Sequence, residues 1–144
     1  MKIFFFKVKY IFMSNFNNHT QAVFAAAIWV FGGDGSLSAE EKSAICDKIN
    51  SSSSPWSISI EDEDSKWVRS VYRRGDLTLS DVVEAIENDM CFSQLEKFQL
   101  YRVICGTMHR TGQGDNSDDG WGRANELRSE LGIDLNDYND WVNN

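Results

Sequence analysis

Residues 21–31 read QAVFAAAIWVF, and this stretch decides the fold class. It is apolar on every side, whereas a helix at a protein surface has a single apolar stripe. Such a stretch predicts a central buried helix, and Gly32 and Gly33 directly after it predict where that helix ends. In the rest of the chain apolar residues recur at helical spacing, and convincing strand alternation is almost absent after residue 12. We therefore expect an all-α protein.

Six amphipathic segments follow this stretch, and together they predict a single-domain bundle of about seven helices. Their apolar residues lie within 45–49, 67–72, 82–90, 95–108, 124–131 and 135–142. Three of the segments begin with a capping box, in which two residues three apart satisfy each other's backbone amides. The pairs are Ser38 with Glu41, Thr78 with Asp81, and Ser93 with Glu96. Gly132 is expected to close the segment that contains residues 124–131.

The charge of the chain narrows the classes of partner. It has 144 residues, a net charge of −8 and a pI of about 4.7. Phosphate backbones repel such a surface, so direct nucleic-acid binding is not expected unless Arg69, Arg73 and Arg74 form a local patch. A cation or a basic protein partner fits better.

Three cysteines, Cys46, Cys91 and Cys105, are widely spaced and form no metal-binding pair. This usage indicates reduced, buried thiols in a cytoplasmic protein rather than a zinc site or a disulfide framework.

The first residues, MKIFFFKVKYIF, are apolar but interrupted by Lys7 and Lys9. They are too short to span a bilayer and too broken for a signal peptide. We interpret residues 1–12 as translated from an over-extended start, with Met13 as an ordinary start. The alternatives are a short edge strand or a weak membrane anchor. Residues 1–17 are therefore treated as an extension, and residues 18–144 as the domain.

A repeated motif, D-G-x-x-x-x-x-E, carries the functional prediction. It occurs at 34–41 and again at 119–126, each time between an apolar and an amphipathic helical segment. We expect each Asp-Gly pair to form a tight turn and each glutamate to project from the first turn of the next helix, back toward the loop.

The second copy lies inside GDNSDDGWGRANE, residues 114–126, which has the spacing of a calcium-binding loop. The predicted ligands are Asp115, Ser117, Asp119 and Glu126. The alternative is a polar turn in which Asp119 or Glu126 caps a helix. The first copy has no oxygen ligand at Val30 or Gly32, so it is not a complete loop of this kind.

The two Asp-Gly turns about eighty residues apart, each between helices, resemble the tellurite-resistance TerB family. AVFAAAIWVFGGDGSLSAEEKSAI is the stronger match, and FQLYRVICGTMHRTGQGDNSDDGWGRANELRSELGI matches in layout but has an inserted loop rich in glycine and aspartate. The resemblance covers roughly residues 18–133. It implies a helical domain with two pseudo-symmetric helix-turn-helix halves, in a bacterial or phage stress or defence setting. It also implies a metal site at Asp34, Glu41, Asp119 and Glu126.

Three functional hypotheses remain open, and none is an enzyme. Catalytic motifs are missing from the sequence, and a structural role is expected for His109. The first hypothesis is a TerB-like interaction module that responds to Ca²⁺ or another divalent cation. The second is an acidic inhibitor or immunity-type protein that covers a basic protein surface, with Trp56 and Trp121 as exposed anchors and Asp118 beside them. The third is a structural or assembly protein. The oligomeric state is left open.

Overall fold

A computed structural model describes residues 18–31, 39–51, 54–56, 77–111 and 118–144. Most of these residues are helical and none of them forms a strand, which confirms the prediction of an all-α bundle. The helical elements in chain order are α2 (His19–Phe31), α3 (Ala39–Ile49), α5 (Leu79–Glu84), the π-helical turn η1 (Ala85–Asp89), α6 (Gln94–Thr111), α8 (Asp118–Glu130) and α9 (Leu135–Asn143). The expected helix around residues 67–72, Ser38 and residues 1–17 lie outside the described residues.

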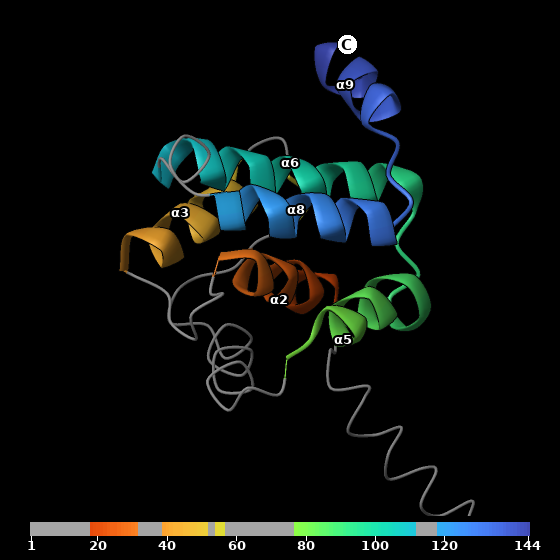
Figure 1. Ribbon diagram of the computed structural model, residues 1–144, viewed down its shortest axis with the longest axis horizontal. Helices are drawn as coiled ribbons and strands as arrows, with labels where there is room; N and C mark the ends of the chain where they lie inside the picture. The colour runs from red at the N-terminus through yellow and green to blue at the C-terminus, as the bar shows by residue number, and fades with distance from the viewer. Residues whose placement is uncertain (1–17, 32–38, 52–53, 57–76, 112–117) are drawn as a thin grey trace, which may run out of the picture.

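Helix α2 is the centre of the bundle, as its all-apolar sequence predicts. Every residue from 21 to 31 is buried, and the helix packs against α3, α5, α6 and α8 (Figure 1). Burying one large apolar side chain of this kind stabilises a fold by about 1.5–3 kcal/mol. The guanidinium of Arg123 on α8 donates to the carbonyl of Trp29 and lies 4.6 Å from the centre of its ring. This contact fixes α8 against the last turn of α2.

Two of the predicted capping boxes are confirmed by reciprocal hydrogen bonds. The Asp81 amide donates to Oγ1 of Thr78, and the Thr78 amide donates to the Asp81 carboxylate, both at 3.1 Å. The Glu96 amide donates to Oγ of Ser93 at 3.2 Å, and the Ser93 amide donates to the Glu96 carboxylate at 2.9 Å. The end of α8 at Gly132 is also confirmed, since this glycine has a φ of +67°, which L side chains rarely adopt.

The π-helical turn η1 was not predicted, because the apolar residues within 82–90 fit a regular helix. The Met90 amide donates to the carbonyl of Ala85, five residues earlier, at 2.8 Å, and the Phe92 amide donates to that of Ile86 at 2.9 Å. The wider turn accompanies the burial of both Ile86 and Phe92. The Phe92 ring then stacks on His19, with centroids 4.7 Å apart.

Helix α9 lies at one end of the bundle and projects beyond the other helices (Figure 1). The Asp134 side chain caps it by accepting from the Asp137 amide at 3.0 Å. Aromatic contacts hold α9 on α6: the Tyr138 ring lies 4.8 Å from that of Tyr101, edge-on. Leu135 and Val142 keep 44% and 37% of their surface exposed, so part of the apolar face of α9 remains open to solvent.

Candidate binding clefts

The first copy of the D-G-x-x-x-x-x-E motif matches the expected layout where it is described. Glu41 lies in the first turn of α3, as predicted, and its side chain is half-buried. Asp34 lies outside the described residues. Of the two proposed metal ligands in this copy, the structure therefore describes only Glu41.

The second copy differs from the prediction. Helix α8 already begins at Asp118, so Asp119 and Gly120 are helical and do not form the expected tight turn. Glu126 is exposed and lies in the third turn of α8 instead of the first. Glu126 lies seven positions after Asp119 in the helix, so their Cα atoms are about 10.5 Å apart along the axis. The turn prediction at Asp119–Gly120 is therefore wrong, because α8 extends further toward the N-terminus than the glycine suggests.

No metal centre is formed by the residues that the structure describes. Within them, no group of three His, Cys, Asp or Glu side chains is arranged to hold a metal ion. Asp115 and Ser117 lie outside these residues, and the side chains of Asp118 and Asp119 are not described. The calcium loop remains a prediction from spacing.

The two tryptophans expected as exposed anchors are not equivalent. Trp56 is only 8% exposed, and its ring stacks on Phe92 with centroids 5.9 Å apart, so its predicted exposure is wrong. A large aromatic next to a serine-rich loop has instead joined the core. Trp121 is half-buried on α8, and its ring meets that of His109 edge-on with centroids 6.0 Å apart.

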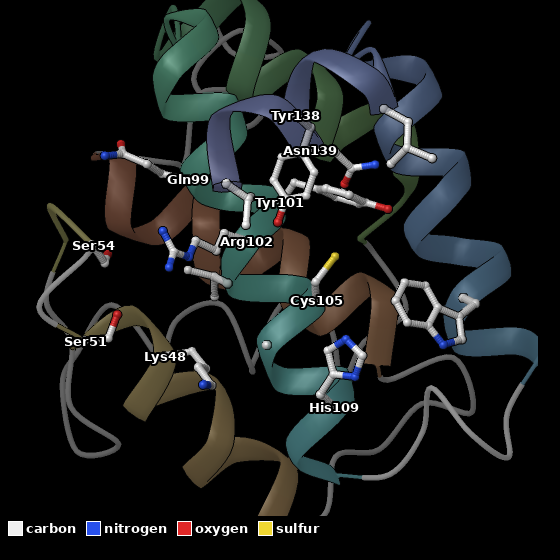
Figure 2. A pocket seen from close by; sticks show the side chains of 15 residues that line it. Lys48, Ser51, Ser54, Gln99, Tyr101, Arg102, Cys105, His109, Tyr138 and Asn139 are labelled. Carbon is white, nitrogen blue, oxygen red and sulfur yellow. The ribbon is translucent and has the colours of Figure 1, made fainter. Parts of the chain in front are cut away.

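A cleft of about 490 Å³, which we call the basic cleft, opens among four of the described helices (Figure 2). It lies among α3, α6, α8 and α9. The face of α6 that lines it contains Gln99, Arg102, Gly106 and His109, and the face of α9 contains Leu135, Tyr138, Asn139 and Val142. Lys48 closes one side from α3, and Trp121 closes another from α8.

Two cations and a histidine face the basic cleft, and its described lining contains no carboxylate. The cations are Lys48 and Arg102, and the histidine is His109 (Figure 2). The chain as a whole has 22 acidic and 14 basic residues, so this lining opposes the net charge. The guanidinium of Arg102 lies 5.6 Å from the centre of the Trp141 ring, which restricts where its charge can lie.

Gly106 positions Lys48 within the basic cleft. A Cβ atom at Gly106 would lie 3.0 Å from Cε and 3.1 Å from Cδ of Lys48, closer than ordinary contact. The glycine therefore gives the lysine stem room to lie across α6, with its ammonium at the cleft. A glycine inside a helix costs about 1 kcal/mol relative to alanine, so this contact has a local cost.

The floor of the basic cleft contains three weak acids in contact. The Cys105 thiol interacts with the side chains of Tyr101 and Tyr138, and Arg128 interacts with Tyr101. Burial raises the pKa of the Cys105 thiol above its ordinary value. Burial, and then the nearby Cys105, raise the pKa of Tyr101 to about 12 and also raise the pKa of Tyr138. All three groups are therefore neutral near pH 7, and Cys105 is not an activated nucleophile.

The cysteines are free, as expected, but they do not share one environment. Cys46 is buried and Cys105 is partly buried, whereas Cys91 is exposed in the turn after η1 with a φ of 49°. The expectation of buried thiols is therefore wrong for Cys91.

A second, smaller hollow of about 280 Å³ has the opposite character, and we call it the acidic groove. Leu79 and Val83 form its apolar part, and Glu84 and Glu130 contribute its charges. Its described lining contains no cation. Asp89 follows the lining residue Asn88, and its pKa is raised by burial and by the nearby Glu84. Its Oδ2 atom is buried and has no hydrogen-bond partner within the described residues.

Neither hollow was predicted from the sequence. Arg102 and His109 are seven residues apart on one amphipathic helix, so their common face could have been recognised. Lys48 comes from a distant segment, and its place beside them depends on how α3 packs on α6. Glu84 and Glu130 likewise meet only through the packing of α5 against α8.

Comparisons with protein-family models, with curated proteins and with solved structures found no match to this chain. Among the described helices, none combines the length and the apolar character needed to cross a bilayer.

Proposed function

We propose that this chain is a non-catalytic interaction protein that binds a basic protein partner through the acidic groove. One observation carries the proposal: an apolar floor at Leu79 and Val83 lies beside the carboxylates of Glu84 and Glu130, without a cation in the described lining. Burial raises the pKa of Asp89, and the negative charge of the nearby Glu84 raises it further.

An arginine or lysine side chain of a partner has the chemistry that fits this groove. Its aliphatic stem would cover Leu79 and Val83, while its charged head would approach Glu84 and Glu130. A net charge of −8 also favours rapid encounter with a basic surface. The same features support the inhibitor or immunity-type reading of the sequence, because such proteins use charge complementarity to find their targets.

The non-catalytic part of the proposal is supported by the state of the reactive side chains. The Cys105 thiol is held protonated by burial. His19 stacks on Phe92 and lies 3.4 Å from the Glu96 carboxylate, and His109 contacts Trp121. These contacts are typical of structural histidines.

The test uses a synthetic peptide of alternating arginine and leucine, binding to the full chain. We expect saturable binding that weakens steeply with added salt, and a loss of about ten-fold in affinity for Glu84→Gln combined with Glu130→Gln. The matched control combines Glu40→Gln with Asp140→Asn, which neutralises two exposed acidic residues outside the groove. Equal weakening in the two double variants would mean that the peptide senses only net charge, and the groove would lose its proposed role.

A calcium-responsive, TerB-like module with two pseudo-symmetric halves is the second candidate. The loop spacing from Asp115 to Glu126 supports it, as does the place of Glu41 in the first turn of α3. Because α8 begins at Asp118, a single Ca²⁺ bound by both Asp119 and Glu126 would require the first turns of α8 to unwind.

This requirement gives the second candidate a specific test. Calcium added to metal-free protein should lower the helical circular dichroism slightly and raise the melting temperature, and Asp119→Ala should abolish both effects. Magnesium is the control, since it demands a tighter octahedral site. If the spectrum and the melting temperature stay unchanged up to millimolar calcium, the segment from Asp115 to Glu126 is not a calcium site.

A further inference from the structure

We propose that the basic cleft is a binding site for a small organic anion, specifically a carboxylate on an aromatic body. This inference is independent of the acidic groove, because it concerns a different face and the opposite charge. Its volume of about 490 Å³ lies in the range of small-molecule sites.

The head group of the ligand follows from the charges that face the cleft. Lys48 and Arg102 come from different helices and face one space, with His109 further along α6 (Figure 2). Within the described residues, none of the three forms an ion pair with a carboxylate. A bound carboxylate would therefore meet cations that no carboxylate of the described residues neutralises.

Both cations already lie against the protein before any ligand arrives. Gly106 accommodates the stem of Lys48 against α6, and the Arg102 guanidinium rests on the Trp141 ring. Side chains that are already held lose less conformational entropy when they bind a ligand. This gain applies to Arg102, whose guanidinium is held by the Trp141 ring.

The body of the ligand follows from the remaining walls. Leu135 and Val142 of α9 line the cleft and keep 44% and 37% of their surface exposed, so a ligand would cover apolar area now open to water. Trp121 adds a half-buried aromatic wall from α8. A flat aromatic group is the chemistry that fits between these residues.

The test uses 2-naphthoate as the anionic probe and 2-naphthamide as its neutral counterpart of nearly the same shape. Binding to the full, isotope-labelled chain is followed by NMR through the Gly106 amide and the Trp121 indole N–H. We expect saturable shifts with 2-naphthoate and about ten-fold weaker binding of 2-naphthamide, because only the carboxylate engages the cations.

Charge variants then assign the interaction to the cleft. Lys48→Met keeps an unbranched stem over Gly106 and removes the charge, and Arg102→Gln removes the other cation. Each variant should weaken the binding of 2-naphthoate by about five-fold or more and leave the binding of 2-naphthamide nearly unchanged. Lys42→Met, on α3 but outside the cleft lining, is the matched control and should bind like the unaltered protein. The same spectra report whether each variant is folded.

Three results would overturn the proposal. The first is equal binding of the anionic and neutral probes, since the cations would then play no part. The second is an equal loss in Lys48→Met and Lys42→Met, since the effect would then reflect net charge alone. Absence of saturable shifts up to millimolar 2-naphthoate would likewise refute the proposed ligand class.

Discussion

Replacing Gly106 by alanine should stabilise the protein slightly, although the new methyl group meets an occupied position. Two opposing terms set the size of the effect. Alanine is favoured over glycine by about 1 kcal/mol inside a helix. The new Cβ would lie 3.0 Å from Cε of Lys48, so the lysine stem must move away.

The cost of moving Lys48 is small, because the contact involves the far end of a flexible and half-exposed side chain. One fully buried methylene is worth about 0.8 kcal/mol, and a partly exposed stem that shifts by a few tenths of an ångström loses only a fraction of that value. The expected net gain is therefore about 0.5 kcal/mol, or a rise of about 1–2 °C in melting temperature for a chain of this size.

Urea unfolding of a double-mutant cycle checks this reasoning. In a Lys48→Ala background no lysine stem has to move, so Gly106→Ala should raise the free energy of unfolding by the full value of about 1 kcal/mol. The difference between the two backgrounds isolates the contact with the lysine stem. Destabilisation by about 1 kcal/mol or more in both backgrounds would refute the argument, since it would show that α3 and α6 need the glycine for their backbones to approach.

Three further predictions concern the capping boxes, the tyrosine hydroxyls and the aromatic core. Ser93→Ala should cost about 1 kcal/mol in urea unfolding by removing a helix cap, whereas Ser129→Ala, at an exposed position inside α8, should cost almost nothing; equal costs would contradict the capping role. The pKa of the Tyr101 hydroxyl is raised to about 12 in the folded state, so its stabilisation is complete below pH 10.0 and is lost as the pH rises toward 12. Tyr101→Phe should therefore lose less stability between pH 8 and pH 11 than the unaltered protein, and equal losses in the two proteins would show that other groups control alkaline unfolding. Trp56→Ala should lower the free energy of unfolding by about 3 kcal/mol, because it removes a buried ring that packs on Phe92. A loss below about 1 kcal/mol in thermal and urea unfolding would contradict the burial of Trp56 in the core.

The sequence was most informative where a local pattern has a local physical cause. The apolar stretch 21–31 could form only a buried helix, and the residue pairs that begin with Thr78 and Ser93 satisfy backbone amides within one turn. Gly132 ends α8 because its positive φ suits a residue without a side chain. Each of these features depends on a few neighbouring residues.

The predictions that failed depend on contacts between distant segments. Trp56 is buried because Phe92, 36 residues later in the chain, offers it a ring to pack on. Gly120 suggested a turn, yet α8 extends through it. The two clefts also arise from tertiary packing, since Lys48 and Glu130 reach them from helices far away in sequence.

The π-helical turn at Ala85–Asp89 has a consequence for how this chain should be aligned with others. It forms the last turn of the helix that α5 begins and amounts to one extra residue there, and each α-helical residue turns the chain by about 100°. In a homologue that lacks the extra residue of this turn, the positions after 90 would match those of this chain only when the numbering is shifted by one. An alignment gap in the last turn of this helix would then be the correct one.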